Sequence, residues 1–312
     1  MKIGISVTSS HSVEDPREGA RNMIDRARTS RDAGLDTLFV GDHHVTPFPY
    51  YQNNVMLARM LAEWGDKPYG ALYLLPLWHP VTLAEQIGTL ASLGKGQFIM
   101  QCGLGDDRQG KAMGIDMSKK VGMFVASINS MRGMWRGERV DEPKYWNLSQ
   151  AKISPVPTDH VDIWVGSLVD KAIERTARMA EGWLAAPSLS PVDSGKVLDR
   201  YMEHCAKYDR VPTAKAIRRD IYVGSSSEDA KKVATPYVEK GYRGIPDDAL
   251  MIGSASEVSG QIRVLEEQGF TDIIVRNISS NQQECMACIE RLSDVKAQLK
   301  YCLLYTSPSP RD

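Results

Sequence analysis

Short apolar runs alternate along the chain with longer amphipathic segments. The short runs predict eight strands, at residues 2–8, 37–40, 70–75, 98–102, 163–165, 183–186, 217–223 and 272–275. Each run is followed by apolar residues at helical spacing, which predict helices at residues 16–32, 55–64, 81–93, 121–135, 171–180, 192–208, 228–240 and 283–299. Strands that alternate with helices from end to end are typical of parallel βα units. Eight such units predict an α/β fold, a closed (β/α)8 TIM barrel with loop insertions.

Two connections between predicted elements repeat the same chemistry. Gly34 lies just before the strand at 37–40, and Gly269 lies just before the strand at 272–275. Glycine can adopt the left-handed conformation that ends a helix, and a short turn then leads into a buried strand. An open doubly wound sheet would instead carry a glycine-rich dinucleotide fingerprint after its first strand, where residues 8–11 contain no glycine.

Three longer stretches, at residues 103–120, 137–161 and 241–256, have no regular pattern. Loops of this length in a compact domain are usually lids or insertions, and the second has room for an extra hairpin. No linker divides the sequence, so residues 1–301 are predicted to form one domain. Residues 302–312 resemble either a translated sequencing-library adapter or a Ser/Pro-rich disordered tail, and both interpretations leave them out of the fold.

Composition limits the partners. The chain has 38 Lys and Arg residues against 39 Asp and Glu, so no broad positive field attracts nucleic acid or an anionic membrane. No stretch approaches the roughly 20 apolar residues of a membrane span. The first residues read as a strand and not as a signal peptide, so we expect a cytoplasmic protein with a small-molecule partner. Cys285 and Cys288 share the apolar face of a predicted helix, which favours packing over a metal or redox role.

In a barrel, catalytic groups follow the carboxyl ends of the strands. The second strand is followed by Asp42, His43 and His44, and histidines at such a position can titrate near neutral pH. We expect His43 to act in the chemistry and His44 to hydrogen-bond a loop. Trp78, after the third strand, suits the wall of an aromatic ligand site and equally suits packing at the barrel rim.

The fourth strand leads into Gln101, Gly103, Gly105 and Asp106. Small residues at a strand end let a planar ring or a phosphate approach the backbone. Gln101 and Asp106 can then hydrogen-bond such a ligand.

Three other strand ends carry candidate ligand-binding residues. Gly166 and Ser167 lie between the fifth strand and a helix, which suits an anion site and equally suits an ordinary helix cap. Ser188 follows the sixth strand and Arg276 ends the eighth, where their side chains can enter the barrel mouth and contact substrate.

Taken together, these segments resemble the luciferase-like monooxygenase family, which includes bacterial luciferase and the deazaflavin F420-dependent oxidoreductases. The resemblance extends to about Leu299 and rests on the order and spacing of residues 36–44, 74–98 and 163–183. It implies FMN or F420 in the barrel mouth, with the ring near His43 and the fourth-strand end and the phosphate near Gly166 and Ser167. Asp42 and His44 are further cofactor-binding residues that it implies. His43 would give a proton to, or take one from, the cofactor or a small organic substrate.

The resemblance leaves the reaction open, since relatives with FMN oxygenate their substrates and relatives with F420 transfer hydride. Gln97 replaces an arginine that many relatives have, and residues 103–105 replace the arginine-bearing turn of true luciferases, so light emission is not implied. Many members have a non-proline cis peptide in the third strand, which the resemblance places between Ala71 and Leu72, beside the ring. A separate flavin reductase and a homodimer are further expectations.

Two alternatives remain. A metal-dependent barrel hydrolase would use His43 and His44 as ligands, but such a site needs further ligands from other strand ends. His160 precedes the fifth strand and His204 lies within a predicted helix, so no metal site is expected. The non-enzymatic alternative is a flavin-binding barrel without turnover, which would bind flavin tightly and oxidise nothing.

Overall fold

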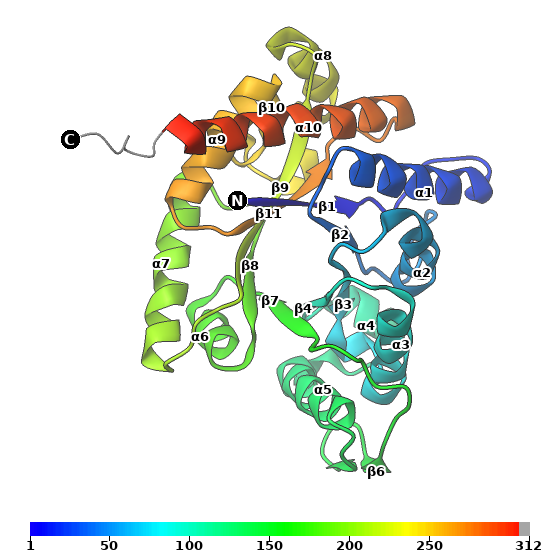
Figure 1. The fold of residues 1–312 in the computed structure, drawn as a ribbon. Helices are drawn as coiled ribbons and strands as arrows, with labels where there is room; N and C mark the ends of the chain where they lie inside the picture. Colours follow the sequence, from blue (N-terminus) through cyan, green and yellow to red (C-terminus); the bar gives the residue numbers. More distant parts are fainter. Residues whose placement is uncertain (306–312) are drawn as a thin grey trace. The chain divides into compact units, whose positions relative to one another are not determined.

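The computed structural model describes the backbone of residues 1–305 and the side chains of residues 1–300. Strands and helices alternate along most of this length (Figure 1). The long parallel strands are β1 (Lys2–Val7), β2 (Thr37–Val40), β3 (Tyr69–Leu74), β4 (Phe98–Gly103), β7 (Asp162–Gly166), β8 (Gly182–Ala185), β9 (Ala214–Val223) and β11 (Asp272–Asn277). The helices predicted after them are α1 (Pro16–Asp32), α2 (Asn53–Trp64), α3 (Pro80–Leu93), α5 (Lys120–Trp135), α6 (Asp170–Met179), α7 (Pro191–Lys207), α8 (Ser227–Val238) and α10 (Gln282–Tyr305).

The strands form one sheet in the order β10-β9-β11-β1-β2-β3-β4-β7-β8. An additional pairing of β8 with β9 closes eight of these strands on themselves. The pairs β1–β11, β11–β9, β3–β4, β4–β7 and β8–β9 are all parallel. The predicted (β/α)8 barrel is therefore confirmed.

Internal contacts divide the chain into two units. Unit 1 contains Met1–Val7, Asp25–Leu38 and the described residues from Ser167 onward, whereas unit 2 contains Thr8–Ile24 and Phe39–Gly166. The assignment of residues 1–301 to one domain stays a prediction. Within the described residues, no helix has the length and apolar character needed to cross a bilayer.

In unit 2, β3 and β4 pair without interruption, from Tyr69 opposite Phe98 to Leu74 opposite Gly103. Side chains of alternate residues point to opposite faces of a strand. The Tyr69 hydroxyl donates to a carbonyl of α3, at Leu90, so Tyr69 and Ala71 share the helix-facing side of β3.

In unit 1, β11 pairs with β1 on one side and with β9 on the other. Helix α10 buries Cys285 and Cys288 completely, both as free thiols. The predicted packing role of this pair is confirmed. Gly34 and Gly269 have φ angles of 77° and 103°, so both adopt the left-handed conformation expected of the helix-ending turns.

The stretches without regular pattern contain short elements. Residues 137–161 include the antiparallel hairpin of β5 (Val140–Glu142) and β6 (Leu148–Ala151), as expected. Residues 241–256 include the 3-10 turns η3 (Tyr242–Gly244) and η4 (Asp247–Ala249) and strand β10 (Met251–Gly253). Helix α9 (Ala255–Glu267), which follows them, was not predicted.

Two expectations need comment. Among the described residues the cis peptide bond is Ser154–Pro155, so the bond between Ala71 and Leu72 is trans and that expectation is wrong. The physical reason is the unbroken register of β3 with β4, which leaves no bulge in the strand. Of the proposed tail at residues 302–312, residues 302–305 continue α10, and the rest lies outside the described residues.

Replacement of Gly70 by alanine should destabilise the protein. A Cβ at this position would overlap the backbone carbonyl oxygen of Ile99 on β4, which cannot move without breaking the sheet. We expect a loss of about 1–3 kcal/mol in the free energy of unfolding, the usual cost of overpacking.

Gly260→Ala is the matched control, because a Cβ there meets no atom within 4 Å in helix α9. This variant should gain up to about 1 kcal/mol, since alanine is the better helix former. Both changes are measured by denaturant unfolding, and equal midpoints for the two variants would contradict the assigned packing.

Candidate functional site

Asp42 is a buried carboxylate just beyond the end of β2. Its Oδ2 accepts hydrogen bonds from the backbone N–H of Leu74 and from the indole N–H of Trp78, both at 2.8 Å. Leu74 ends β3, and the 3-10 turn η1 (Leu75–Leu77) separates it from Trp78. Because a buried carboxylate is costly unless hydrogen-bonded, Asp42 fixes the end of β3 and the Trp78 ring beside the end of β2.

His44 is held on several sides. Its backbone N–H donates to the Gln109 side-chain oxygen at 2.7 Å. Its Nε2 lies 3.1 Å from Asp42 Oδ1 without the alignment of a hydrogen bond, and its ring meets Trp78 edge to face at 5.5 Å. These contacts give His44 a positioning role.

His43 faces different partners. Its Nε2 lies 3.1 Å from Nη2 of Arg108, and its ring centroid lies 5.7 Å from that of Tyr50. A guanidinium can only donate, so Nε2 must accept, and the ring is neutral with its proton on Nδ1. Burial lowers the pKa of His43, and the positive charge of Arg108 lowers it further. The structure therefore holds this imidazole in the form able to take up a proton.

Arg108 is aimed by the short helix α4 (Asp107–Ala112). Asp106 caps this helix by accepting hydrogen bonds from the backbone and side-chain nitrogens of Gln109 at 2.8 and 2.6 Å. The first of these bonds is the main reason that the pKa of Asp106 is lowered. Arg108 is braced from its other side because its Nη1 donates to the Val45 carbonyl at 2.9 Å. Asp106 thus acts on His43 through α4.

Sequence analysis did not identify Arg108, Gln109 or Tyr50. A usable pattern was present, because Asp106 is followed three residues later by Gln109, the spacing of a helix capping box. Tyr50 had no comparable pattern, since it lies in an irregular loop.

Gln101 lies on β4, opposite Leu72 on β3 and Trp164 on β7. It is buried, and its side-chain Nε2 has no hydrogen-bond partner in the described protein. Leu72 packs with Trp78 against a small apolar cluster, which contains Leu74, Leu77 and Met117. One polar donor beside apolar surface is the composition of a small-ligand site.

The glycines that follow Gln101 are placed as expected at the strand end. Gly103 is the last residue of β4, and Gly105 has a left-handed φ of 71°. Ala71 is fully buried on the helix-facing side of β3, opposite to Leu72, so its side chain does not join the surface of Leu72 and Gln101. The cofactor contact expected at Ala71 involves its peptide bond to Leu72 and not its side chain, so it stays a prediction.

Gly166 ends β7 and is exposed. Ser167 follows, with its hydroxyl 3.0 Å from Thr176 Oγ1 and its carbonyl accepting from the Trp183 indole at 3.0 Å. Helix α6 begins after Val169 without a side-chain cap. Ser167 therefore does not cap α6, and the uncapped N–H groups at this helix start leave the anion-site interpretation as a proposal.

The two remaining candidates lie in unit 1. Ser188 is exposed after β8. Arg276 lies on β11, with its Nη1 3.9 Å from a carboxylate oxygen of Asp220 on β9. Asp220 was not identified from the sequence.

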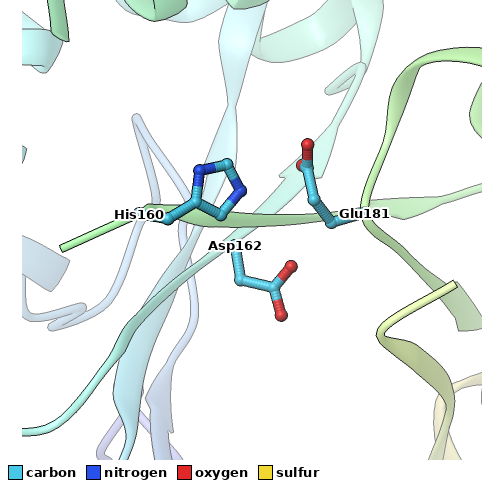
Figure 2. Close-up of side chains that lie close together, drawn as sticks. All are labelled: His160, Asp162 and Glu181. Atoms are coloured by element: carbon cyan, nitrogen blue, oxygen red, sulfur yellow. The ribbon is translucent and has the colours of Figure 1, made fainter. Parts of the chain in front are cut away.

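The metal-hydrolase alternative receives no support at the histidines. Within the described residues, neither His43 nor His44 belongs to a group of three or more side chains suited to hold a metal ion. His160 and Asp162, labelled in Figure 2 with Glu181, lie at the amino end of β7, whereas His43 follows the carboxyl end of β2.

The chain is similar to known proteins in both sequence and fold. The pattern that describes luciferase-like monooxygenases matches residues 1–292. An F420-dependent glucose-6-phosphate dehydrogenase of Nakamurella multipartita is 24% identical over 184 residues, which cover 55% of this chain and 54% of that protein. The chain thus spans about half the length of the curated relatives it matches.

Two solved structures have the same fold. The oxygenating constituent of 3,6-diketocamphane monooxygenase from Pseudomonas putida, in complex with FMN, gives a TM-score of 0.80 at 17% identity and covers 96% of this chain and 98% of that one. An F420-dependent secondary alcohol dehydrogenase in complex with an F420-acetone adduct gives 0.78 at 15% identity, with the same coverage of 96% and 98%.

Removal of the Arg108 charge should raise the pKa of His43. In Arg108→Met the repulsion between guanidinium and imidazolium disappears, whereas burial of the ring remains. The pKa should therefore move up while staying below the usual histidine range, and an NMR titration of the imidazole measures it.

Lys111→Met is the control, because it removes an exposed positive charge from the same helix without a contact to His43. An unchanged His43 pKa in Arg108→Met would contradict the assignment. Since the folded state favours the neutral ring, this site contributes stability above the usual histidine pKa and loses it as pH falls toward the lowered one.

Proposed function

The chain belongs to the luciferase-like monooxygenase family, and we propose that it is an oxidoreductase that uses FMN or F420 on a small organic molecule. The observation that carries the proposal is a neutral histidine at a strand end, in the same unit as a buried amide donor that lacks a protein partner. An acid–base group and an unpaired hydrogen-bond donor at the carboxyl ends of barrel strands suit a site for a redox cofactor.

The residues of unit 2 suit a flavin or deazaflavin ring. Such a ring has two apolar faces and a polar edge, and Gln101 Nε2 can donate to that edge. Leu72 and Trp78 offer apolar surface, and Gly103 and Gly105 leave the backbone accessible. When bound, the cofactor would supply the hydride or oxygen chemistry that side chains cannot perform. Gly166 and Ser167 are the proposed residues for its phosphate, at the start of α6.

His43 moves the proton in this proposal. Redox change at an alcohol or carbonyl carbon requires a proton to leave or reach the oxygen. A neutral imidazole takes up the proton in the first case, and the imidazolium returns it in the second. Nε2 is the ring nitrogen without a proton, so it is the proton acceptor, and it exchanges its hydrogen bond with Arg108 when it acts. Asp42, His44 and Trp78 hold the loop that presents this ring.

A cytoplasmic location, a separate flavin reductase and a homodimer belong to the same proposal. They rest on the family and on the small-molecule chemistry expected of the site. A flavin reductase is needed if FMN oxygenates the substrate, since each such turnover leaves the FMN oxidised.

Cofactor choice is tested by titrating the purified protein with FMN and F420 separately and following flavin fluorescence or absorbance. We expect one of them to bind, and Gln101→Leu to weaken binding by about fivefold, the value of one hydrogen bond of about 1 kcal/mol. The same variant should leave the free protein at least as stable, because it removes a buried donor without a partner. Failure of both cofactors to bind would refute the proposal.

His43→Ala should lower turnover far more than His44→Ala, by about 10² to 10⁴ in rate, the usual contribution of a general acid or base. His44→Ala should act mainly on stability, since it removes the ring that packs on Trp78 and keeps the backbone N–H that donates to Gln109. The measurement is the turnover number beside the unfolding midpoint of each variant. Equal losses of turnover would show a shared structural role, and tight cofactor binding without turnover on any substrate would favour the non-enzymatic barrel.

A further inference from the structure

Three arginines surround one buried carboxylate in unit 1. Asp220 on β9 has a fully buried side chain. Its Oδ2 lies 2.6 Å from Arg243 Nη1 and 3.9 Å from Arg276 Nη1, and its Oδ1 lies 3.5 Å from Arg218 Nη2. The Tyr242 hydroxyl also donates to Oδ2, at 2.9 Å. We call these three arginines with Asp220 the arginine cluster.

The arginine cluster lies on one face of the sheet. Arg276 is the register partner of Asp220, and Arg218 lies two residues before Asp220 on the same side of β9. Arg219 points the other way, toward the Pro187 carbonyl and beside Gln261 of α9. The arginine cluster therefore faces away from the α9 side, toward the inside of the barrel and in the carboxyl half of the strands.

Arg243 reaches the arginine cluster through unusual backbone geometry. Its φ is 53°, a left-handed conformation that is costly for a residue with a side chain. Gly241 and Gly244 on either side have φ angles of 74° and 66°. Strained backbone of this kind persists where the surroundings demand it, commonly at ligand sites. Here it directs a guanidinium onto Asp220.

The charges of the arginine cluster do not balance. Three guanidinium groups face one carboxylate, which leaves an excess of two positive charges. Burial lowers the pKa of Arg218 to about 10, and Arg276 and Arg243 act in the same direction against Asp220. Arg218 Nε is buried and has no hydrogen-bond partner in the described protein. Buried charge without compensation is costly, so a further anion would stabilise this arrangement.

The arginine side chains of the cluster are partly exposed to solvent. The side chains of Arg218, Arg243 and Arg276 are 23%, 40% and 20% exposed, whereas that of Asp220 is 0% exposed. Asp220 thus acts as the internal anchor that orients the guanidiniums, and the unpartnered Nε of Arg218 and the exposed side chain of Arg243 are the groups offered to a ligand. Planar guanidiniums bind carboxylate and phosphate groups with two parallel hydrogen bonds.

We propose that the arginine cluster is an anion subsite that binds a carboxylate or phosphate group of the substrate, so that the enzyme acts on organic anions. The assignment of this anion to the substrate rests on the proposed function. The binding of an anion by the arginine cluster does not depend on that function. The cofactor carries a phosphate too, and the shared chemistry requires an experiment that separates the two sources.

The probe is inorganic phosphate, added to the purified full chain at constant ionic strength with chloride as the reference salt. Binding to the folded state raises the unfolding temperature in a saturable way, from which Kd follows. We expect phosphate to stabilise the wild-type protein, and Arg243→Gln to weaken phosphate binding at least about tenfold, since a charge-assisted hydrogen bond contributes about 1.5–3 kcal/mol. Arg276→Gln should have a similar effect.

Arg28→Gln is the matched control, because Arg28 is a half-exposed arginine of unit 1 paired with Asp25 on the surface. It should leave the phosphate effect unchanged. Absence of a saturable effect in the wild-type protein, or equal effects in Arg243→Gln and Arg28→Gln, would overturn the proposal. Arg243 is the most exposed member of the arginine cluster, and its loss leaves Asp220 with two cationic partners, so this variant should fold.

Competition distinguishes the sources. If phosphate and the bound cofactor occupy the protein together, with unchanged cofactor Kd, the anion subsite belongs to the substrate. If saturating FMN or F420 displaces phosphate, the subsite belongs to the cofactor and the substrate assignment is overturned. If neither cofactor binds while phosphate does, the proposed function fails and the anion subsite stands.

Discussion

The buried carboxylate of Asp42 is the constraint on which the candidate site depends. A buried carboxylate needs hydrogen-bond donors. Asp42 has two, the backbone N–H of Leu74 at the end of β3 and the indole N–H of Trp78. The same contacts bring Trp78 against His44, which leaves the preceding residue, His43, to turn toward α4. One buried charge thus separates two adjacent histidines into a positioning residue and a residue available for proton transfer.

Helix α4 positions Arg108 beside His43. A helix of six residues is too short to be stable alone, because nucleation costs more than so few hydrogen bonds return. Here Asp106 caps it, and buried Gln109 links it to the backbone of His44. The protonation state of His43 therefore depends on the helix cap at Asp106, because that cap positions Arg108 beside the imidazole.

The sequence predicted the long elements well because their apolar periodicity is strong, and α1 and β2 have the predicted bounds. The sequence analysis missed β10, because a three-residue strand is too short to show a period. It also missed α9, although Ser254 and Glu257 form a capping box, which is typical of a helix start. The position of Asp42 and His43 directly after a predicted strand identified them as candidate site residues. Tyr50 lies in an irregular loop, and no local sequence pattern predicts its position. The bond after Ala71 is trans, and β3 pairs with β4 without interruption there, so the sequence resemblance did not predict this local backbone.

Charge balance over a whole chain conceals local imbalance. The near equality of 38 basic and 39 acidic residues is a property of the chain as a whole. It says nothing of a few arginines on adjacent strands, where low surrounding polarity strengthens each charge. In the arginine cluster the strand register sets Arg276 opposite Asp220, and the left-handed turn at Arg243 adds a third guanidinium. A small anion that loses its water there gains charge-assisted hydrogen bonds, whereas a neutral molecule would leave the excess positive charge uncompensated, so the charge of the arginine cluster favours anionic ligands.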